Sequence, residues 1–337
     1  MSMKIPRVVQ IALILLAAAA AVAAAAKPPA NYKVVKTWKL GGEGGWDYLM
    51  ADSDGHRLFI ARATRVMVID SQSGKSIGEI PDTPGVHGIA LAPEFGRGFT
   101  SNGREDMVSV FDLKSLALQK KIKVGERPDA ILYDPFSKRV FTFNAKSQDT
   151  TAVDAGKGEV AGTLALGGKP EYAATDAKGT IFVNIEDKSE LVALDPQKLV
   201  VKSRWKLTGC EDPTGLSLDA KNRRLFSGCG NKKMAIVDAD SGKVLATPEI
   251  GDGCDGTAFD PGRGYAFATA HDGTLTVIHE DAPDKFSVAQ TVTTQKGART
   301  ITLDPKTHEV FTVTADVSPD RKVAPDSFVV LVVEGTD

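Results

Sequence analysis

Apolar and polar residues alternate in short runs along most of this chain, and Gly, Asp, Asn and Pro separate one run from the next. Runs of this kind predict β-strands with one buried face. They are rich in Val, Ile, Phe and Thr, which favour strands. The pattern therefore predicts an all-β protein.

One four-strand pattern recurs seven times. A phenylalanine marks the second strand of each copy, about 40 to 44 residues after the previous one: Phe59, Phe99, Phe141, Phe182, Phe226, Phe267 and Phe311. Two further markers have the same period, an apolar run that ends in an Asp-containing turn and an alternating run that ends in Asp. In the third copy the predicted strands are 130–133, 139–144, 151–154 and 159–166. Four short strands with this period are typical of a propeller blade, so the sequence predicts a seven-bladed β-propeller with four-stranded blades.

The two ends of the repeat region predict how the ring closes. The last copy ends near Val333 after three strands. The run Tyr32–Leu40 precedes the first copy and resembles the fourth strands of other copies, such as Lys202–Leu207. We expect this N-terminal strand to complete the last blade and to cover an edge that would otherwise be exposed.

The first 26 residues have the layout of a secretory signal peptide. Lys4 and Arg7 precede the apolar run Val8–Ala26, which only Gln10 interrupts, and Ala24–Ala26 forms a small-residue cleavage site. A retained membrane anchor is the alternative, but the run is rich in Ala and lacks a basic stop-transfer flank. We therefore expect residues 1–26 to be removed and residues 27–337 to form a single propeller domain, periplasmic or secreted, with no membrane span after cleavage.

Composition excludes several classes of function. The formal net charge is −2, and it becomes −4 once Lys4 and Arg7 are removed, so charge does not indicate nucleic-acid binding. The sequence contains no CxxCH, HExxH or GxSxG motif and no phosphate-binding glycine loop. Its three tryptophans argue against a large flat cofactor. No cofactor is evident, apart from the option of Ca²⁺ or a similar divalent metal.

Several segments resemble a known family. The third copy reads Pro128–Pro135, then Arg139–Asn144, then a strand that ends in Asp154, and it resembles the YVTN repeat of YncE-like bacterial propellers. The segments Gly209–Gly215, with Gly228–Asn231, and Gly297–Thr300 resemble an exported subgroup of that family. The resemblance covers roughly residues 32–333. It implies a propeller fold and export, and it implies no catalytic motif.

The three cysteines allow three different single bridges. Cys210 and Cys229 fall within one copy and match the subgroup motif, which favours a Cys210–Cys229 disulfide and leaves Cys254 free near the channel. A Cys229–Cys254 bridge and buried free thiols are the alternatives.

Strand topology places the loop before the first strand and the loop after the second strand of every blade on one face, which we call the top face. The residues that open the first strands form a predicted ring at the mouth of the central channel: Asp47, His87, Asp129, Glu171, Thr214, Asp255 and Arg299. Carboxylates in flexible loops suit Ca²⁺, and Arg299 suits a polar organic anion. The alternative is a solvated rim without a function.

Three further residues complete the candidate ligand-binding set. Trp46 lies beside Asp47 and could stack on a ligand or pack structurally. Asn144 and His271 follow second strands and are expected in the top-face loops. Because His87 and His271 belong to blades two and six, they could meet only over the channel axis, so we do not expect a zinc site built from histidines.

We therefore expect an exported, monomeric binding scaffold that takes a small-molecule or protein ligand at the channel mouth. Two alternatives stay open. One is a metal-dependent, lactonase-like hydrolase that uses the channel-mouth carboxylates, and the other is a subunit that docks a redox partner. Fold alone supports none of these, because propellers host unrelated functions.

Overall fold

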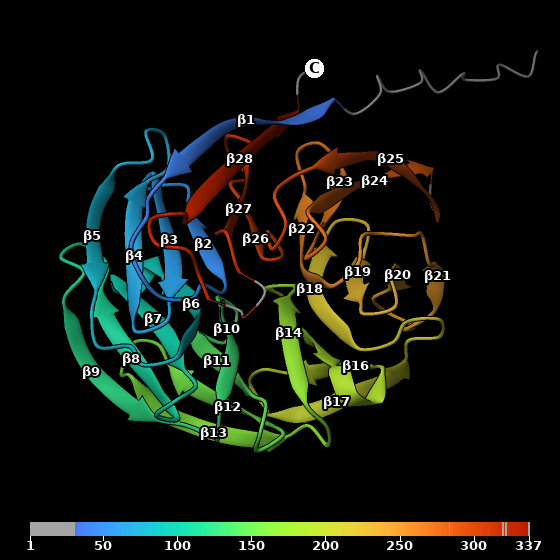
Figure 1. The fold of residues 1–337 in the computed structure, drawn as a ribbon. Helices are drawn as coiled ribbons and strands as arrows, with labels where there is room; N and C mark the ends of the chain where they lie inside the picture. The colour runs from blue at the N-terminus through green and yellow to red at the C-terminus, as the bar shows by residue number, and fades with distance from the viewer. Residues whose placement is uncertain (1–30, 283, 319, 321, 336–337) are drawn as a thin grey trace, which may run out of the picture.

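The computed structural model describes residues 31–282, 284–318, 320 and 322–335, and within them the protein is almost entirely β-structure. Seven four-stranded antiparallel sheets form a ring, as Figure 1 shows, and this confirms the predicted seven-bladed β-propeller. The predicted signal peptide lies outside the described residues. Within the described ranges, no helix is long and apolar enough to cross a membrane.

Each blade takes four strands in chain order, except the last. The strands of blades 1 to 3 are β2 (Leu49–Asp52), β3 (Arg57–Arg62), β4 (Arg65–Asp70), β5 (Ser76–Ile80), β6 (Val86–Ala92), β7 (Arg97–Asn102), β8 (Met107–Asp112), β9 (Leu118–Lys123), β10 (Pro128–Asp134), β11 (Arg139–Asn144), β12 (Asp149–Asp154) and β13 (Glu159–Ala165). Those of blades 4 and 5 are β14 (Pro170–Thr175), β15 (Ile181–Ile185), β16 (Glu190–Asp195), β17 (Val200–Lys206), β18 (Pro213–Asp219), β19 (Arg224–Cys229), β20 (Lys233–Asp238) and β21 (Val244–Ala246). Those of blades 6 and 7 are β22 (Cys254–Asp260), β23 (Tyr265–Ala270), β24 (Thr274–Ala282), β25 (Lys285–Thr293), β26 (Ile301–Leu303), β27 (Val310–Thr314), β28 (Val329–Gly335) and β1 (Tyr32–Lys39). Two short 3₁₀ turns are η1 (Pro93–Phe95) and η2 (Glu186–Lys188).

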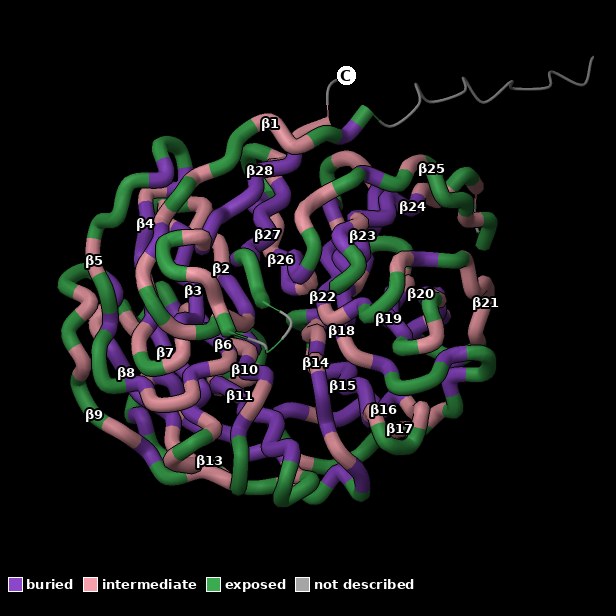
Figure 2. The backbone as a smooth tube through the Cα atoms, in the orientation of Figure 1, coloured by how far each residue is buried: buried purple, intermediate pink, exposed green. Residues whose placement is uncertain are grey.

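Burial follows the position of a strand within its blade. The first strands line the centre of the ring and the fourth strands its rim, and Figure 2 shows the second and third strands as mostly buried. Strand β11 is buried at five of its six positions, whereas β13 has no buried residue. The seven marker phenylalanines are at most 2% exposed. They pack between neighbouring blades, and this packing sets the period seen in the sequence.

Strand β1 closes the ring as predicted. It pairs antiparallel with β28 from Tyr32 opposite Gly335 to Lys39 opposite Val329. Tyr32 is 3% exposed, and its ring lies 5.1 Å from that of Phe267 in blade 6. At the other end of the strand, Trp38 stacks on Phe311 of blade 7. The N-terminal strand therefore joins the last blade to its neighbour through both backbone pairing and side-chain packing.

Backbone hydrogen bonds tie the two top-face loops of a blade together. The backbone N–H of Ala145, after the second strand of blade 3, donates to the carbonyl of Arg127, before the first strand. The N–H of His271 makes the equivalent bond to Gly253 in blade 6. These loops therefore share one face, as the topology predicted.

Candidate functional site

The seven predicted ring residues occupy equivalent places in the fold. His87, Asp129, Glu171, Thr214 and Asp255 are each the second residue of a first strand, and Asp47 and Arg299 lie two residues before β2 and β26. All seven have partly or largely buried side chains. The repeat therefore places one polar residue per blade at the inner end of the sheet, where the blades converge (Figure 1).

Five ring residues form a continuous chain of charged contacts across five blades. Arg299 Nε donates to Asp255 Oδ2 at 2.6 Å, and Arg299 Nη2 lies 3.9 Å from Asp47 Oδ1. The other carboxylate oxygen of Asp47 lies 2.6 Å from His87 Nδ1, and Asp129 Oδ1 lies 3.5 Å from the same nitrogen. The two cations thus separate three carboxylates that would otherwise repel one another.

The remaining two ring positions behave differently. The Thr214 hydroxyl donates to the backbone carbonyl of Cys254 at 2.7 Å, so it holds blade 5 to blade 6. Glu171 is 8% exposed, and its Oε2 makes no hydrogen bond within the described structure. The ammonium group of Lys169 lies 3.3 Å from that oxygen but without hydrogen-bond geometry, and it also contacts Glu186. Glu171 therefore holds a buried carboxylate oxygen without a hydrogen-bond partner among the described residues.

Burial controls the titration of the ring. Loss of hydration raises the pKa of Asp47, Asp129 and Asp255 above the usual range of a carboxyl group. The same cause, reinforced by the charge of Asp129, raises the pKa of Glu171 to about 8. Burial alone would lower the pKa of His87, but the hydrogen bond to Asp47 and the charges of Asp129 and Asp47 outweigh it and raise that pKa. The charged forms of these carboxyl groups are therefore disfavoured, because burial removes their hydration.

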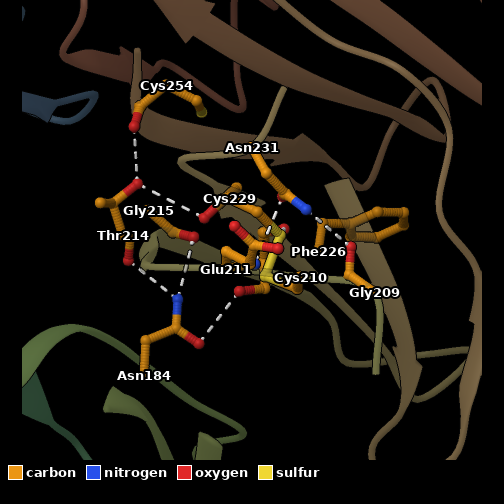
Figure 3. The surroundings of a disulfide bond; sticks show 12 residues. Asn184, Gly209, Cys210, Glu211, Thr214, Gly215, Phe226, Cys229, Asn231 and Cys254 are labelled. Atoms are coloured by element: carbon orange, nitrogen blue, oxygen red, sulfur yellow. Dashed lines mark hydrogen bonds between the residues drawn. A yellow bond between two sulfur atoms is a disulfide. The ribbon is translucent and has the colours of Figure 1, made fainter. Parts of the chain in front are cut away.

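Buried hydrogen bonds between blades fix the backbone of the ring. The Thr300 hydroxyl donates to the carbonyl of Asp47 at 2.9 Å, and the Thr269 hydroxyl donates to that of Arg299 at 2.6 Å. Asn184 Nδ2 donates to the carbonyl of Thr214 at 2.8 Å, as Figure 3 shows. The ring side chains therefore project from a rigid frame, as a preorganised site requires.

A tyrosine pair, which the sequence analysis missed, lies next to the ring. Tyr48 and Tyr172 each follow a ring residue, in blades 1 and 4, and their rings meet edge to face at 5.0 Å. Tyr48 is 6% exposed, and burial together with the charges of Asp129 and Glu171 raises its pKa well above the usual value. Because these blades lie on opposite sides of the ring, the tyrosine pair spans the centre of the ring.

Two hollows flank Trp46 on the top face. One, of about 470 Å³, lies over blades 1 to 3 and is lined in part by Asp47, His87, Arg104 and Arg127. The other, of about 960 Å³, lies over blades 6 and 7 and is lined in part by His271, Lys296, Arg299 and Val317. Both volumes fall within the range of small-molecule sites.

Two of the three additional predicted residues line these hollows. Trp46 lines both, packs 6.0 Å from the ring of Phe328, and leaves its buried indole Nε1 without a hydrogen-bond partner within the described structure. His271 is exposed in the larger hollow. Asn144, in contrast, is completely buried and donates to Asp149 and Thr151 of its own hairpin. Asn144 therefore stabilises blade 3 and is excluded from the candidate site.

A possible set of metal ligands lies within the ring. Asp47, His87 and Asp129 each offer one ligand atom, and these atoms lie within 4.8 Å of one another. A histidine with two carboxylates suits a transition metal, Zn²⁺ above all, better than Ca²⁺, which prefers oxygen ligands.

The predicted Cys210–Cys229 disulfide is confirmed, with a Cα–Cα distance of 5.4 Å (Figure 3). The bridge closes a loop over blade 5 and is expected to contribute about 3 kcal/mol by restricting the unfolded chain. Asn231 holds the same loop, since its side chain donates to the carbonyl of Gly209 and accepts from the N–H of Glu211. Cys254 is free and buried, and burial raises the pKa of its thiol to about 12.

Arg62 is a buried residue whose role the sequence did not reveal. Its guanidinium is completely buried and donates to all five carbonyls of the loop from Gly41 to Gly45. It also lies 3.7 Å from the ring centre of Phe328. This loop leads from the closing strand β1 to Trp46 and Asp47. Arg62 therefore fixes the backbone that leads into the channel mouth.

Comparison with known proteins gives a distant relation. No family model matches the chain. It is 24% identical over 189 residues to the uncharacterized protein YncE of Escherichia coli strain K12, covering 52% of each chain. It is 22% identical over 209 residues to YncE of Salmonella typhimurium strain LT2, covering 57% of this chain and 58% of that one. The chain thus spans little more than half the length of these curated relatives, and the similarity agrees with the YncE-like resemblance of its repeats.

Solved structures share the propeller fold. A chain of Kuenenia stuttgartiensis hydrazine synthase superposes with a TM-score of 0.69 at 18% identity, covering 80% of this chain and 92% of that one. The WD40 repeats of RRP9 superpose with a TM-score of 0.74 at 10% identity, covering 91% and 99%. At these identities the likeness shows the fold alone.

Proposed function

We propose that this YncE-like propeller is an exported binding scaffold that takes its ligand at the channel mouth, through the polar ring and the hollows beside Trp46. Export to the periplasm is supported by the signal-peptide pattern of residues 1–26 and by the Cys210–Cys229 disulfide, since disulfides persist in oxidising compartments. The ligand is a small molecule or a protein segment, and the scaffold acts as a monomer.

The burial of carboxylates at equivalent positions around the ring is the observation that carries this proposal. Burying a charged carboxylate costs stability, and apolar residues would fill the same space at lower cost. Asp129, Glu171 and Asp255 nevertheless occupy equivalent positions in three blades and all have raised pKa values. Perturbed titrating groups that gather in a concave site are characteristic of function, because strain of this kind persists where a ligand uses it.

A metal-dependent hydrolase is the second candidate, and the Asp47–His87–Asp129 group favours it. A bound divalent metal would polarise a substrate carbonyl, and these three side chains would hold it. Metal analysis of the purified protein, with unfolding measured before and after chelation, tests this candidate. The redox-subunit alternative has no feature of the described residues in its favour.

Replacing Glu171 with Gln tests whether the ring is kept at the expense of stability. The pKa of Glu171 is raised from 4.5 to about 8 in the folded protein, so the folded state holds its proton more tightly than the unfolded state. The protonated carboxyl therefore stabilises the fold at low pH, and this contribution is lost as pH rises from about 4.5 to about 8. We expect Glu171→Gln to be as stable as the wild type at pH 5 and more stable at pH 8, by on the order of a few kcal/mol.

Urea denaturation at both pH values measures this difference. Glu190→Gln is the matched control, because Glu190 pairs with Arg204 at 2.7 Å and with Lys206 at 3.0 Å on the outside of the same blade. Its neutralisation should lower stability slightly at both pH values. A Glu171→Gln protein that is clearly less stable than the wild type at pH 8 would show that the ring is structural, against the proposal.

A further inference from the structure

The hollow over blades 1 to 3 has a lining that is more positive than the ring beside it. Its charged residues are Asp47, His87, Arg104 and Arg127. Asp47 already has two cationic neighbours, His87 and Arg299. Arg104 and Arg127 are exposed, and no ion pair or hydrogen bond of either guanidinium occurs within the described parts of the chain. The hollow therefore presents two guanidinium groups that make no ion pair or hydrogen bond with the described residues.

Arg127 stands where the repeat favours glycine. It lies two residues before a ring residue, and the equivalent positions in blades 2, 6 and 7 are Gly85, Gly253 and Gly297, all with positive φ. Arg127 itself has a φ of 54°, a left-handed conformation that is unfavourable for an L-residue. Its backbone N–H is held by Asp106 Oδ1 at 2.8 Å. Glycine would suit this backbone conformation at least as well, so what Arg127 adds to the hollow is its side chain, and blade 5 likewise has a non-glycine residue with positive φ here, Asp212.

Arg104 is seated by a close approach to Gly85. A Cβ at Gly85 would lie 2.9 Å from the backbone nitrogen of Arg104 and would collide with its side chain. Gly85 thus allows Arg104 to pack against the loop that opens blade 2. Trp46 and the methyl groups of Val86 provide the apolar part of the same lining.

We infer that this hollow binds a small organic anion, with its carboxylate or phosphate group held between Arg104 and Arg127 and its body against Trp46. The inference rests on the proposed function and names the ligand class. Guanidinium groups bind carboxylate and phosphate oxygens through paired, charge-assisted hydrogen bonds. An indole face suits the planar or apolar part of such a ligand. A volume of about 470 Å³ holds a compact acid rather than a polymer.

The same charges oppose a metal ion at this place. The charge of Arg127 already acts on both His87 and Asp129, two of the three candidate metal ligands. A divalent cation would face this guanidinium and that of Arg299, with no further carboxylate in the lining of the hollow. Anion binding is therefore the reading that the lining favours.

Calorimetric titration at fixed ionic strength tests the inference, with citrate, benzoate, glycerol 3-phosphate and inorganic phosphate as probes. Arg127→Gly is the principal variant, since four other blades carry glycine at this position and the fold should be preserved. Arg104→Gln is the second variant. Lys232→Gln, at an exposed lysine of a blade 5 loop that lines neither hollow, is the matched control. Mn²⁺ and Zn²⁺ are titrated in parallel.

At least one organic anion is expected to bind the wild type saturably and to bind Arg127→Gly and Arg104→Gln at least about tenfold more weakly, with binding to Lys232→Gln unchanged. Binding of citrate or benzoate with no glycerol 3-phosphate binding identifies a carboxylate ligand, and the reverse identifies a phosphate ester. The inference is overturned if none of the four anions binds, if Arg127→Gly binds them as the wild type does, or if only a metal binds. A cationic or neutral ligand lost on changing ring residues would overturn it too, yet would sustain the proposed function.

Discussion

Removing residues 27–40, which include the closing strand β1, is expected to destabilise the propeller by about 5 kcal/mol or more. The estimate follows from the side chains that lose their burial, chiefly Tyr32, Val34 and Trp38. Tyr32 packs between Tyr265 and Phe267 of blade 6, and Trp38 stacks on Phe311 of blade 7. Each large apolar side chain contributes roughly 1.5 to 3 kcal/mol on burial.

Loss of β1 would also expose a new sheet edge. Strand β28 is central in blade 7, between β1 and β27, and the deletion would leave its backbone groups unpaired along the side that faced β1. Exposed edges of this kind promote association between chains. We therefore expect a lower unfolding midpoint together with a tendency to aggregate.

Chemical denaturation of the mature and truncated proteins measures the effect. A synthetic peptide of residues 31–40, added in trans, should restore part of the lost stability, because it can pair with β28 as β1 does. Lys36→Gln is the control within the strand, since Lys36 is largely exposed and makes surface ion pairs with Glu309 and Glu334. A truncated protein that unfolds like its parent would disprove closure by the N-terminal strand.

Replacing Arg62 with Met is expected to cost about 4 kcal/mol or more. The guanidinium is the only donor that the described structure supplies to several carbonyls of the Gly41–Gly45 loop, and it has no carboxylate partner among the described residues. Burial, with a smaller effect of the charge of Arg65, lowers the pKa of Arg62 to about 10. Methionine would preserve the packing against Phe328 and leave these carbonyls without a partner.

Arg65→Gln provides the matched control. Arg65 lies three residues further along the hairpin, near the surface, where its guanidinium lies 3.4 Å from the Glu43 carbonyl and 3.4 Å from the Glu79 carboxylate. Its replacement should change stability by less than about 1 kcal/mol. Unfolding in urea, followed by tryptophan fluorescence, compares the variants, since Trp46 directly follows the loop. Equal stability of Arg62→Met and Arg65→Gln would refute the role assigned to Arg62.

The repeat predicted the fold and the ring because both depend on periodic positions. Aligning seven copies identifies equivalent residues without any knowledge of side-chain direction, so Asp47, His87 and Arg299 could be placed together at the channel mouth. Their contacts confirm the alignment, since a shift of one residue would have turned these side chains away from one another.

The tyrosine pair was missed because only a comparison with the equivalent positions of the other copies points to it. Tyr48 and Tyr172 stand one position after the ring, where blades 2, 5 and 6 have glycine. These glycines are required where neighbouring backbones approach, as at Gly215, whose added Cβ would lie 2.6 Å from the nitrogen of Thr257. Blades 1 and 4 have the two tyrosines at this position instead, and their rings meet across the centre. Comparing this column across the copies would have revealed the pair.

Arg62 and Asn144 show where local reasoning fails. Both are polar residues at the end of a second strand, the position from which Asn144 was predicted to lie in a top-face loop. Each is completely buried because a nearby segment supplies partners, the Gly41–Gly45 carbonyls for Arg62 and the β11–β12 hairpin for Asn144. Such partners come from a loop conformation with positive φ at Gly41, Gly42 and Gly44, or from side chains facing inward. Neither the loop conformation nor the inward-facing side chains produce a periodic pattern in the sequence.

The central claim is that the channel mouth binds a ligand, and a thermal-shift screen of a broad metabolite library with paired proteins tests it most directly. The pair is the wild type and a ring variant in which Asp129→Asn is combined with Arg127→Gly beside it, which should fold because Asn keeps the shape of the first side chain, four other blades carry glycine at the second position, and the Arg299–Asp255 hydrogen bond is left in place. We expect at least one compound to raise the unfolding temperature of the wild type in a dose-dependent way and to leave the unfolding temperature of the ring variant unchanged. A library without such a compound, or one whose stabilising compounds act equally on both proteins, would contradict it.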